Sequence, residues 1–138
     1  MSSTTPPIVR SVIAVAAGVF VGGIAVFGVE ALAHAFIPPP PGLDVSDRAA
    51  VKVAIATLPT ANFLPILLGY IVGPTLGATL AARMAPVRPF VHAGLVGGFF
   101  LVGGITNFVN LPHPVWFVAL SILAFVLAPL AGTRLAGR

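Results

Sequence analysis

Four long apolar segments limit what this chain can fold into more than any other feature does. They cover residues 8–37, 60–82, 90–109 and 115–132. About 20 consecutive apolar residues in a helix cross the hydrocarbon core of a bilayer, and a helix satisfies its own backbone hydrogen bonds there. The segments therefore predict an all-α, polytopic transmembrane four-helix bundle, built as a single membrane domain over residues 1–138.

The composition agrees with a membrane protein. Hydrophobic residues make up 58% of the chain and charged residues 7%, whereas soluble domains carry about 25% charged residues. The chain contains no cysteine, which excludes disulfides, thiolate nucleophiles and thiolate metal sites. The net charge of +4 comes from basic residues scattered over the loops, so nucleic acid is not an expected partner.

The longest polar stretch, residues 38–58, separates the first two apolar segments. Four consecutive prolines, Pro38–Pro41, favour an extended polyproline conformation. A short amphipathic helix is expected over residues 47–57, with Asp44 or Ser46 capping it. Three apolar residues share one face of that helix: Val51, Ile55 and Leu58. The helix either lies on the membrane surface or extends the next span outward.

Basic residues are distributed unequally between the two sides of a four-span topology. One side holds five of them, namely Arg10, Arg83, Arg88, Arg134 and Arg138. The other side holds Arg48 and Lys52, beside Asp44 and Asp47. Because basic residues concentrate in cytoplasmic loops, we expect both termini in the cytoplasm and residues 38–58 on the outer side.

Small residues recur at four-residue spacing in every apolar segment. Such patterns allow close approach of helix backbones in lipid. The glycines expected to pack helices together are Gly18, Gly22, Gly69, Gly73, Gly77, Gly94 and Gly98.

Glu30 is the only acidic residue inside an apolar segment, and His34 follows it by one helical turn. An intramembrane carboxylate indicates a functional site by default. The topology brings further polar residues to the same outer depth, which makes a candidate polar or ligand site of Glu30, His34, Asn62, Asn107, Asn110 and His113. Three interpretations remain open: a carboxylate held by hydrogen bonds from Asn62 or Asn107, a proton- or ligand-binding group, and a solvated interfacial residue.

The sequence offers little for metal binding or catalysis. Glu30, His34 and His113 are too few and too scattered for a convincing zinc site, so no metal and no cofactor is expected. The chain has no phosphate-binding loop, no Gly-x-Ser-x-Gly elbow and no His-Glu-x-x-His motif. Ser121 fits a helix-packing role, and His92 is expected at the membrane interface. We therefore predict that the protein is not an enzyme.

Three runs carry a resemblance: VEALAHAFIPPPPGLDVSD, ATLPTANF and NFVNLPHPVWF. With these runs the chain resembles a group of small, uncharacterised four-span bacterial integral membrane proteins, which implies a bacterial inner (cytoplasmic) membrane and no particular activity. Small multidrug-resistance exporters also have a carboxylate in the first of four spans, but Glu30 lies near the end of its span.

Two functions follow as expectations. The first is a non-enzymatic integral membrane protein with a structural or partner-binding role, in contact with the lipid bilayer and with a second copy or another membrane protein. The alternative is a small transporter or proton-coupled carrier that uses Glu30. A packed, hydrogen-bonded Glu30 favours the first, and a Glu30 that faces a cavity favours the second.

Overall fold

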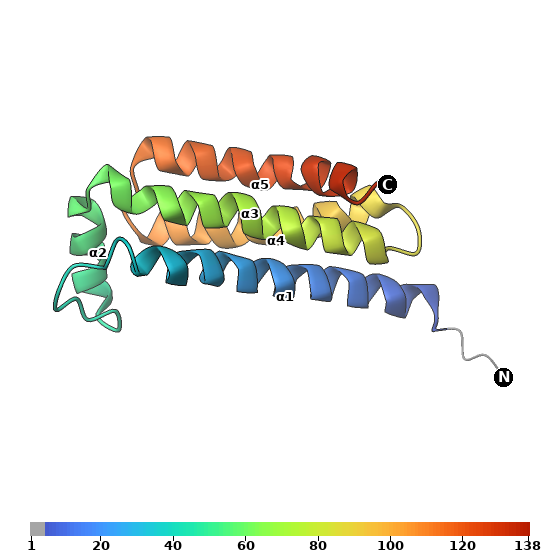
Figure 1. Cartoon of the computed structure of the whole chain (residues 1–138), viewed down its shortest axis with the longest axis horizontal. Helices are drawn as coiled ribbons and strands as arrows, with labels where there is room; N and C mark the ends of the chain where they lie inside the picture. Colours follow the sequence, from blue (N-terminus) through green and yellow to red (C-terminus); the bar gives the residue numbers. More distant parts are fainter. Residues whose placement is uncertain (1–4) are drawn as a thin grey trace.

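The computed structural model describes residues 5–138, and this part of the chain folds into five α-helices without a strand (Figure 1). They are α1 (Pro7–His34), α2 (Arg48–Thr57), α3 (Thr60–Met84), α4 (Pro89–Asn110) and α5 (Val115–Leu135). All except α2 are long and apolar enough to cross a membrane. The prediction of an all-α bundle with four spans and a short helix after the first span is confirmed.

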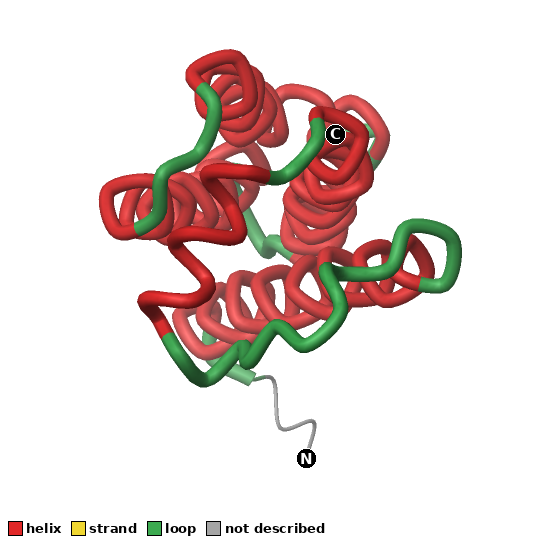
Figure 2. The backbone as a smooth tube through the Cα atoms, turned by 90° about the vertical axis from the view of Figure 1, so that its left-hand side faces the viewer, coloured by secondary structure: helices red, strands yellow, loops and turns green. Residues whose placement is uncertain are grey.

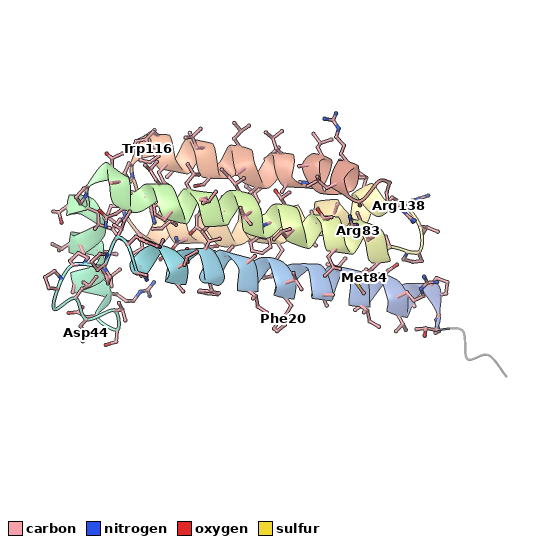
Figure 3. The ribbon with its side chains drawn as sticks, viewed as in Figure 1. Phe20, Asp44, Arg83, Met84, Trp116 and Arg138 are labelled. Atoms are coloured by element: carbon pink, nitrogen blue, oxygen red, sulfur yellow. The ribbon has the colours of Figure 1, made fainter. Side chains whose placement is uncertain are left out.

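Helix α3 is the element on which the bundle is assembled. It packs against α1, α4 and α5, whereas α1 packs mainly on α3 and to a smaller extent on α4. Figure 2 shows the bundle nearly end-on, with the helices around a common axis. Large apolar side chains such as Phe20 and Phe27 are exposed on the outside, with 69% and 73% of their surface accessible. Figure 3 shows Phe20 pointing away from the bundle, as expected of a side chain that meets lipid.

Helices α1 and α3 meet backbone to backbone along a line of small residues. Gly18 faces Gly77, Gly22 faces Gly73, and Val26 faces Gly69. A Cβ atom on Gly73 would lie 2.6 Å from the Gly22 carbonyl oxygen, and one on Gly77 would collide with the carbonyl oxygen of Gly18. The absence of side chains therefore sets the distance between the two helices.

The packing glycines of α4 differ from the prediction. Gly94 and Gly98 face open space, because an added Cβ atom would meet nothing within 4 Å. Gly97 and Gly104 pack instead, against α5. Pro129 in α5 cannot donate to the carbonyl of Phe125, and this carbonyl oxygen lies 3.1 Å from where a Cβ of Gly97 would be.

The first span is shorter than predicted, and the other three exceed their predicted ends by at most three residues. Helix α1 ends at His34 and not at residue 37. The backbone N–H groups of Phe36 and Ile37 both donate to the Ala33 carbonyl, at 2.9 and 2.8 Å, which closes the last turn. Pro38 follows, and the residue before a proline is disfavoured in helical conformation.

Helix α2 crosses the end of the bundle (Figure 1), so the interpretation that it extends the next span outward is wrong. The cap is Asp47 and not the expected Asp44 or Ser46. Asp47 accepts hydrogen bonds from the backbone N–H groups of Ala49 and Ala50, at 2.9 and 3.3 Å. Ile55 and the following Leu58 pack against the cluster that includes Phe63. The apolar face of α2 therefore covers the bundle end, and its basic residues, Arg48 and Lys52, are exposed.

The opposite end of the bundle is held by two arginines. Arg83 donates to the backbone carbonyl of Leu135 at 3.1 Å, and Arg138 donates to that of Ala85 at 3.3 Å. Figure 3 places both arginines at this end, opposite Asp44 and Trp116. These hydrogen bonds join the end of α5 to the turn between α3 and α4, and they use carbonyls at helix ends that lack helical partners.

We predict that Gly77→Ala lowers the melting temperature of the purified protein in detergent, because its Cβ would push α1 away from α3. Overpacking of this kind costs about 1–3 kcal/mol. Gly98→Ala is the matched control on an open position, and it should leave the melting temperature unchanged or raise it slightly. Equal melting temperatures for the two variants would contradict the close contact between α1 and α3 along this line of small residues.

Candidate functional site

Glu30 lies where the contact line between α1 and α3 ends. Each step of four residues along α1 is matched by four residues back along α3, so the pair after Val26–Gly69 is Glu30–Pro65. Here α3 presents Pro65 and Ile66 in place of glycine, and a cavity of about 200 Å³ opens beside them. Glu30 lines this cavity, which we call the Glu30 cavity.

The Glu30 cavity is formed by three stretches of the chain that are distant in sequence. The end of α1 and the start of α3 supply the polar side chains, which are those of Glu30, His34 and Asn62. The segment between α1 and α2 closes one side, through Pro39, Pro40 and residues that follow them. The remaining lining is apolar: Ala33, Ile37, Leu43, Val45, Leu58, Pro65 and Ile66.

The Glu30 carboxylate is partly buried and has no hydrogen-bond partner among residues 5–138. His34 is close enough to interact with it electrostatically but is itself exposed. The other two acids are engaged in local structure: Asp47 caps α2, and Asp44 accepts from the hydroxyl of Ser46 at 2.6 Å and from its N–H at 2.9 Å. These hydrogen bonds lower the pKa of Asp44. Glu30 therefore differs from both in lacking a local partner.

The two asparagines of α4 belong to a neighbouring site. Asn107 donates to the Tyr70 hydroxyl at 3.4 Å, and Asn110 donates to the backbone carbonyl of Thr106 at 2.7 Å. Both line a second cavity of about 390 Å³ between α2 and α4, together with Arg48. Neither Asn62 nor Asn107 hydrogen-bonds Glu30, so the interpretation of Glu30 as a hydrogen-bonded structural residue has no contact to support it.

His113 lies apart from Glu30, in an aromatic cluster between α3, α4 and α5. Its ring stacks on Phe117 with centroids 5.3 Å apart, and it meets Phe63 and Phe108 edge-on. Its Nδ1 is 3.0 Å from the Leu111 carbonyl. Burial lowers the pKa of His113 below its ordinary value of 6.5. Within residues 5–138, no three His, Cys, Asp or Glu side chains come together as a metal site would require.

Sequence reasoning missed two residues near the candidate site, Tyr70 and Arg48. Tyr70 accepts the hydrogen bond from Asn107. Its ring lies at a tilt against Phe117 and Phe125, with ring centroids 5.8 and 5.3 Å apart. The signal was present, because Phe63 and Tyr70 are seven residues apart and share a face of α3. Arg48 was interpreted only as a topology signal, because nothing in the sequence indicates that α2 folds back over the end of α4.

Comparison of the chain with protein-family models, with curated protein sequences and with solved structures finds no match. The site is therefore interpreted from its own geometry.

We predict that the protein loses stability as the pH falls below about 6.5 and that His113 accounts for part of this loss. The pKa of His113 is lower in the folded state, so the unfolded chain binds the proton first and protonation favours unfolding. The contribution of His113 to the free energy of unfolding is fully present above pH 6.5 and declines as the pH falls below that value. Melting temperatures measured from pH 8 to pH 5 should fall less for His113→Phe, which keeps the stack on Phe117. Parallel curves for the two proteins would count against this role.

Proposed function

We propose that the chain is a non-enzymatic, multi-pass protein of the bacterial inner membrane that binds a small organic cation in the Glu30 cavity. The observation that carries the proposal is a carboxylate that lines a mostly apolar cavity without a hydrogen-bond partner among the described residues. A carboxylate removed from water is costly unless a counter-charge or a hydrogen bond compensates it. A ligand ammonium group in the cavity would supply that counter-charge.

The lining of the cavity supports a ligand with an apolar body. Ile37, Leu43, Leu58 and Ile66 offer apolar surface, and Asn62 adds one hydrogen-bonding group. A volume of about 200 Å³ fits a small ligand and not an extended one. His34 stands at the exposed edge, where it contributes little to a ligand held deeper in the cavity.

We place the cavity on the outer side of the membrane, with both termini in the cytoplasm. The basic residues support this orientation: five arginines lie at the end of the bundle that is opposite the cavity. The cavity would then take its ligand from outside the cell or from the outer leaflet.

A proton-coupled carrier is a second candidate. It is supported by a further cavity of about 180 Å³ between α1 and α4, lined by Gly23, Tyr70 and Gly103 among others. This cavity begins one turn from Glu30 along α1, at Val26 and Phe27, and extends towards the middle of the bundle.

A structural or partner-binding role is the third candidate. Gly94 and Gly98 support it, because they leave a shallow strip of α4 uncovered within the monomer. A small-residue strip of this kind suits a second copy of the chain or another membrane protein.

We predict that benzyltrimethylammonium raises the melting temperature of the full chain in detergent, whereas its uncharged isostere neopentylbenzene does not. Glu30→Gln should weaken binding of the cation about tenfold or more, because the attraction between the ammonium charge and the carboxylate is lost. Asp44→Asn is the matched control, since Asp44 is an exposed acid engaged with Ser46.

The outcomes separate the candidates. Equal shifts with the cation and its isostere, or an unchanged shift in Glu30→Gln, would exclude a cation site at Glu30. Uptake of the cation into proteoliposomes that depends on both Glu30 and a pH gradient would establish the carrier. Absence of binding together with dimers that Gly94→Leu disrupts would favour the partner-binding role.

The orientation yields a separate prediction. A fluorescent protein that matures only in the cytoplasm should fluoresce when it is fused after Arg138, and alkaline phosphatase at the same position should be inactive. Alkaline phosphatase inserted after Gly42 should be active. The reverse pattern would place the Glu30 cavity on the cytoplasmic side.

A further inference from the structure

An apolar groove runs between α1 and α4 at the end of the bundle opposite the Glu30 cavity. It has a volume of about 370 Å³ and is lined by Ser11, Val12, Val15 and Ala16 of α1 and by His92 and Leu95 of α4. We call it the inner groove. It exists because α1 packs chiefly on α3 and leaves its side towards α4 loosely covered. Its apolar walls suit a hydrocarbon chain.

His92 is a buried polar residue in the wall of the inner groove, and one of its ring nitrogens has no partner in the described part of the chain. Its side chain is 94% buried and lines the groove. Its Nδ1 lies 3.2 Å from the backbone carbonyl of Arg88, and because a carbonyl only accepts, Nδ1 carries the proton. Nε2 has no hydrogen-bond partner within residues 5–138.

The charges around the inner groove are positive. Arg10 precedes Ser11 on α1, and Arg88 stands at the start of α4, one turn before His92. Helix α4 begins without a side-chain cap, so its N-terminus adds a partial positive charge. All three acids of the chain, Glu30, Asp44 and Asp47, belong to the opposite end.

We propose that the inner groove binds one anionic phospholipid, with an acyl chain between α1 and α4 and the phosphate near Arg10, Arg88 and His92. A phospholipid combines the two chemistries that the site offers, an apolar channel and a cationic mouth, and basic sites between membrane helices are suited to anionic headgroups. A second copy of the chain fits less well, because it would bring its own arginines to the same mouth. This inference does not depend on a ligand in the Glu30 cavity.

The test measures lipid binding to the full chain in an uncharged detergent. Native mass spectrometry counts the lipids retained when dioleoylphosphatidylglycerol or dioleoylphosphatidylcholine is added, and the melting temperature is recorded with each. We expect one phosphatidylglycerol to be retained and to raise the melting temperature more than phosphatidylcholine does. Arg88→Asn should weaken phosphatidylglycerol binding about fivefold, as expected for the loss of one basic residue at the surface. Asn tolerates the left-handed backbone of Arg88, where φ is 47°.

Matched variants distinguish a site from a general preference for anionic lipid. Arg134→Gln removes one charge from the same end on α5 and should leave binding unchanged. Leu95→Trp fills the groove and should abolish retention, whereas Val102→Trp, on an exposed position of α4 outside the groove, should not. Arg88→Lys keeps the charge and should keep most of the binding. This variant checks that substitution at position 88 does not by itself disrupt the fold. Equal retention of the two lipids, or equal losses in Arg134→Gln and Arg88→Asn, would overturn the proposal.

Discussion

The direct backbone contact between α1 and α3 is the constraint on which the rest of the structure depends. Because lipid supplies no hydrophobic force between helices, their association relies on close packing and on small residues that permit it. The carbonyl oxygens of Gly18, Gly22 and Val26 approach glycines of α3 at each successive turn. This contact fixes the register of α1, and the register decides which residues of α3 face its polar end.

Two of the cavities beside α1 follow from the same contact. The line of small residues stops at the level of Glu30, because α3 has Pro65 there in place of a glycine, and the Glu30 cavity opens at that level. On its other side, α1 has little contact with α4, and the inner groove occupies the space near Ser11 and Leu95. The close contact between α1 and α3 is thus accompanied by the Glu30 cavity at one end of α1 and by the inner groove at the other.

The fold could be predicted from the sequence to a large extent because it rests on local signals. Apolar length determines the four spans, and the amphipathic stretch after the prolines determines α2, although its cap is Asp47 and not the expected Asp44 or Ser46. The candidate site could be predicted only in part. The pairing of Glu30 with His34 is local, since they are one turn apart, but the separation of Asn107 and His113 from them depends on how the helices rotate. On α4 two small-residue faces compete, and only contact with Pro129 and Phe125 selects Gly97 and Gly104 over Gly94 and Gly98. No sequence pattern reports that choice.

The four prolines after α1 have a consequence for chemical selectivity. Proline has no backbone N–H, so the wall that Pro39 and Pro40 contribute to the Glu30 cavity can accept hydrogen bonds and cannot donate them. A guest rich in acceptors, such as a carboxylate or a phosphate, finds no donor on these two residues. The same residues that end the helix therefore bias the cavity against anions, and they would do so even if Glu30 were neutral.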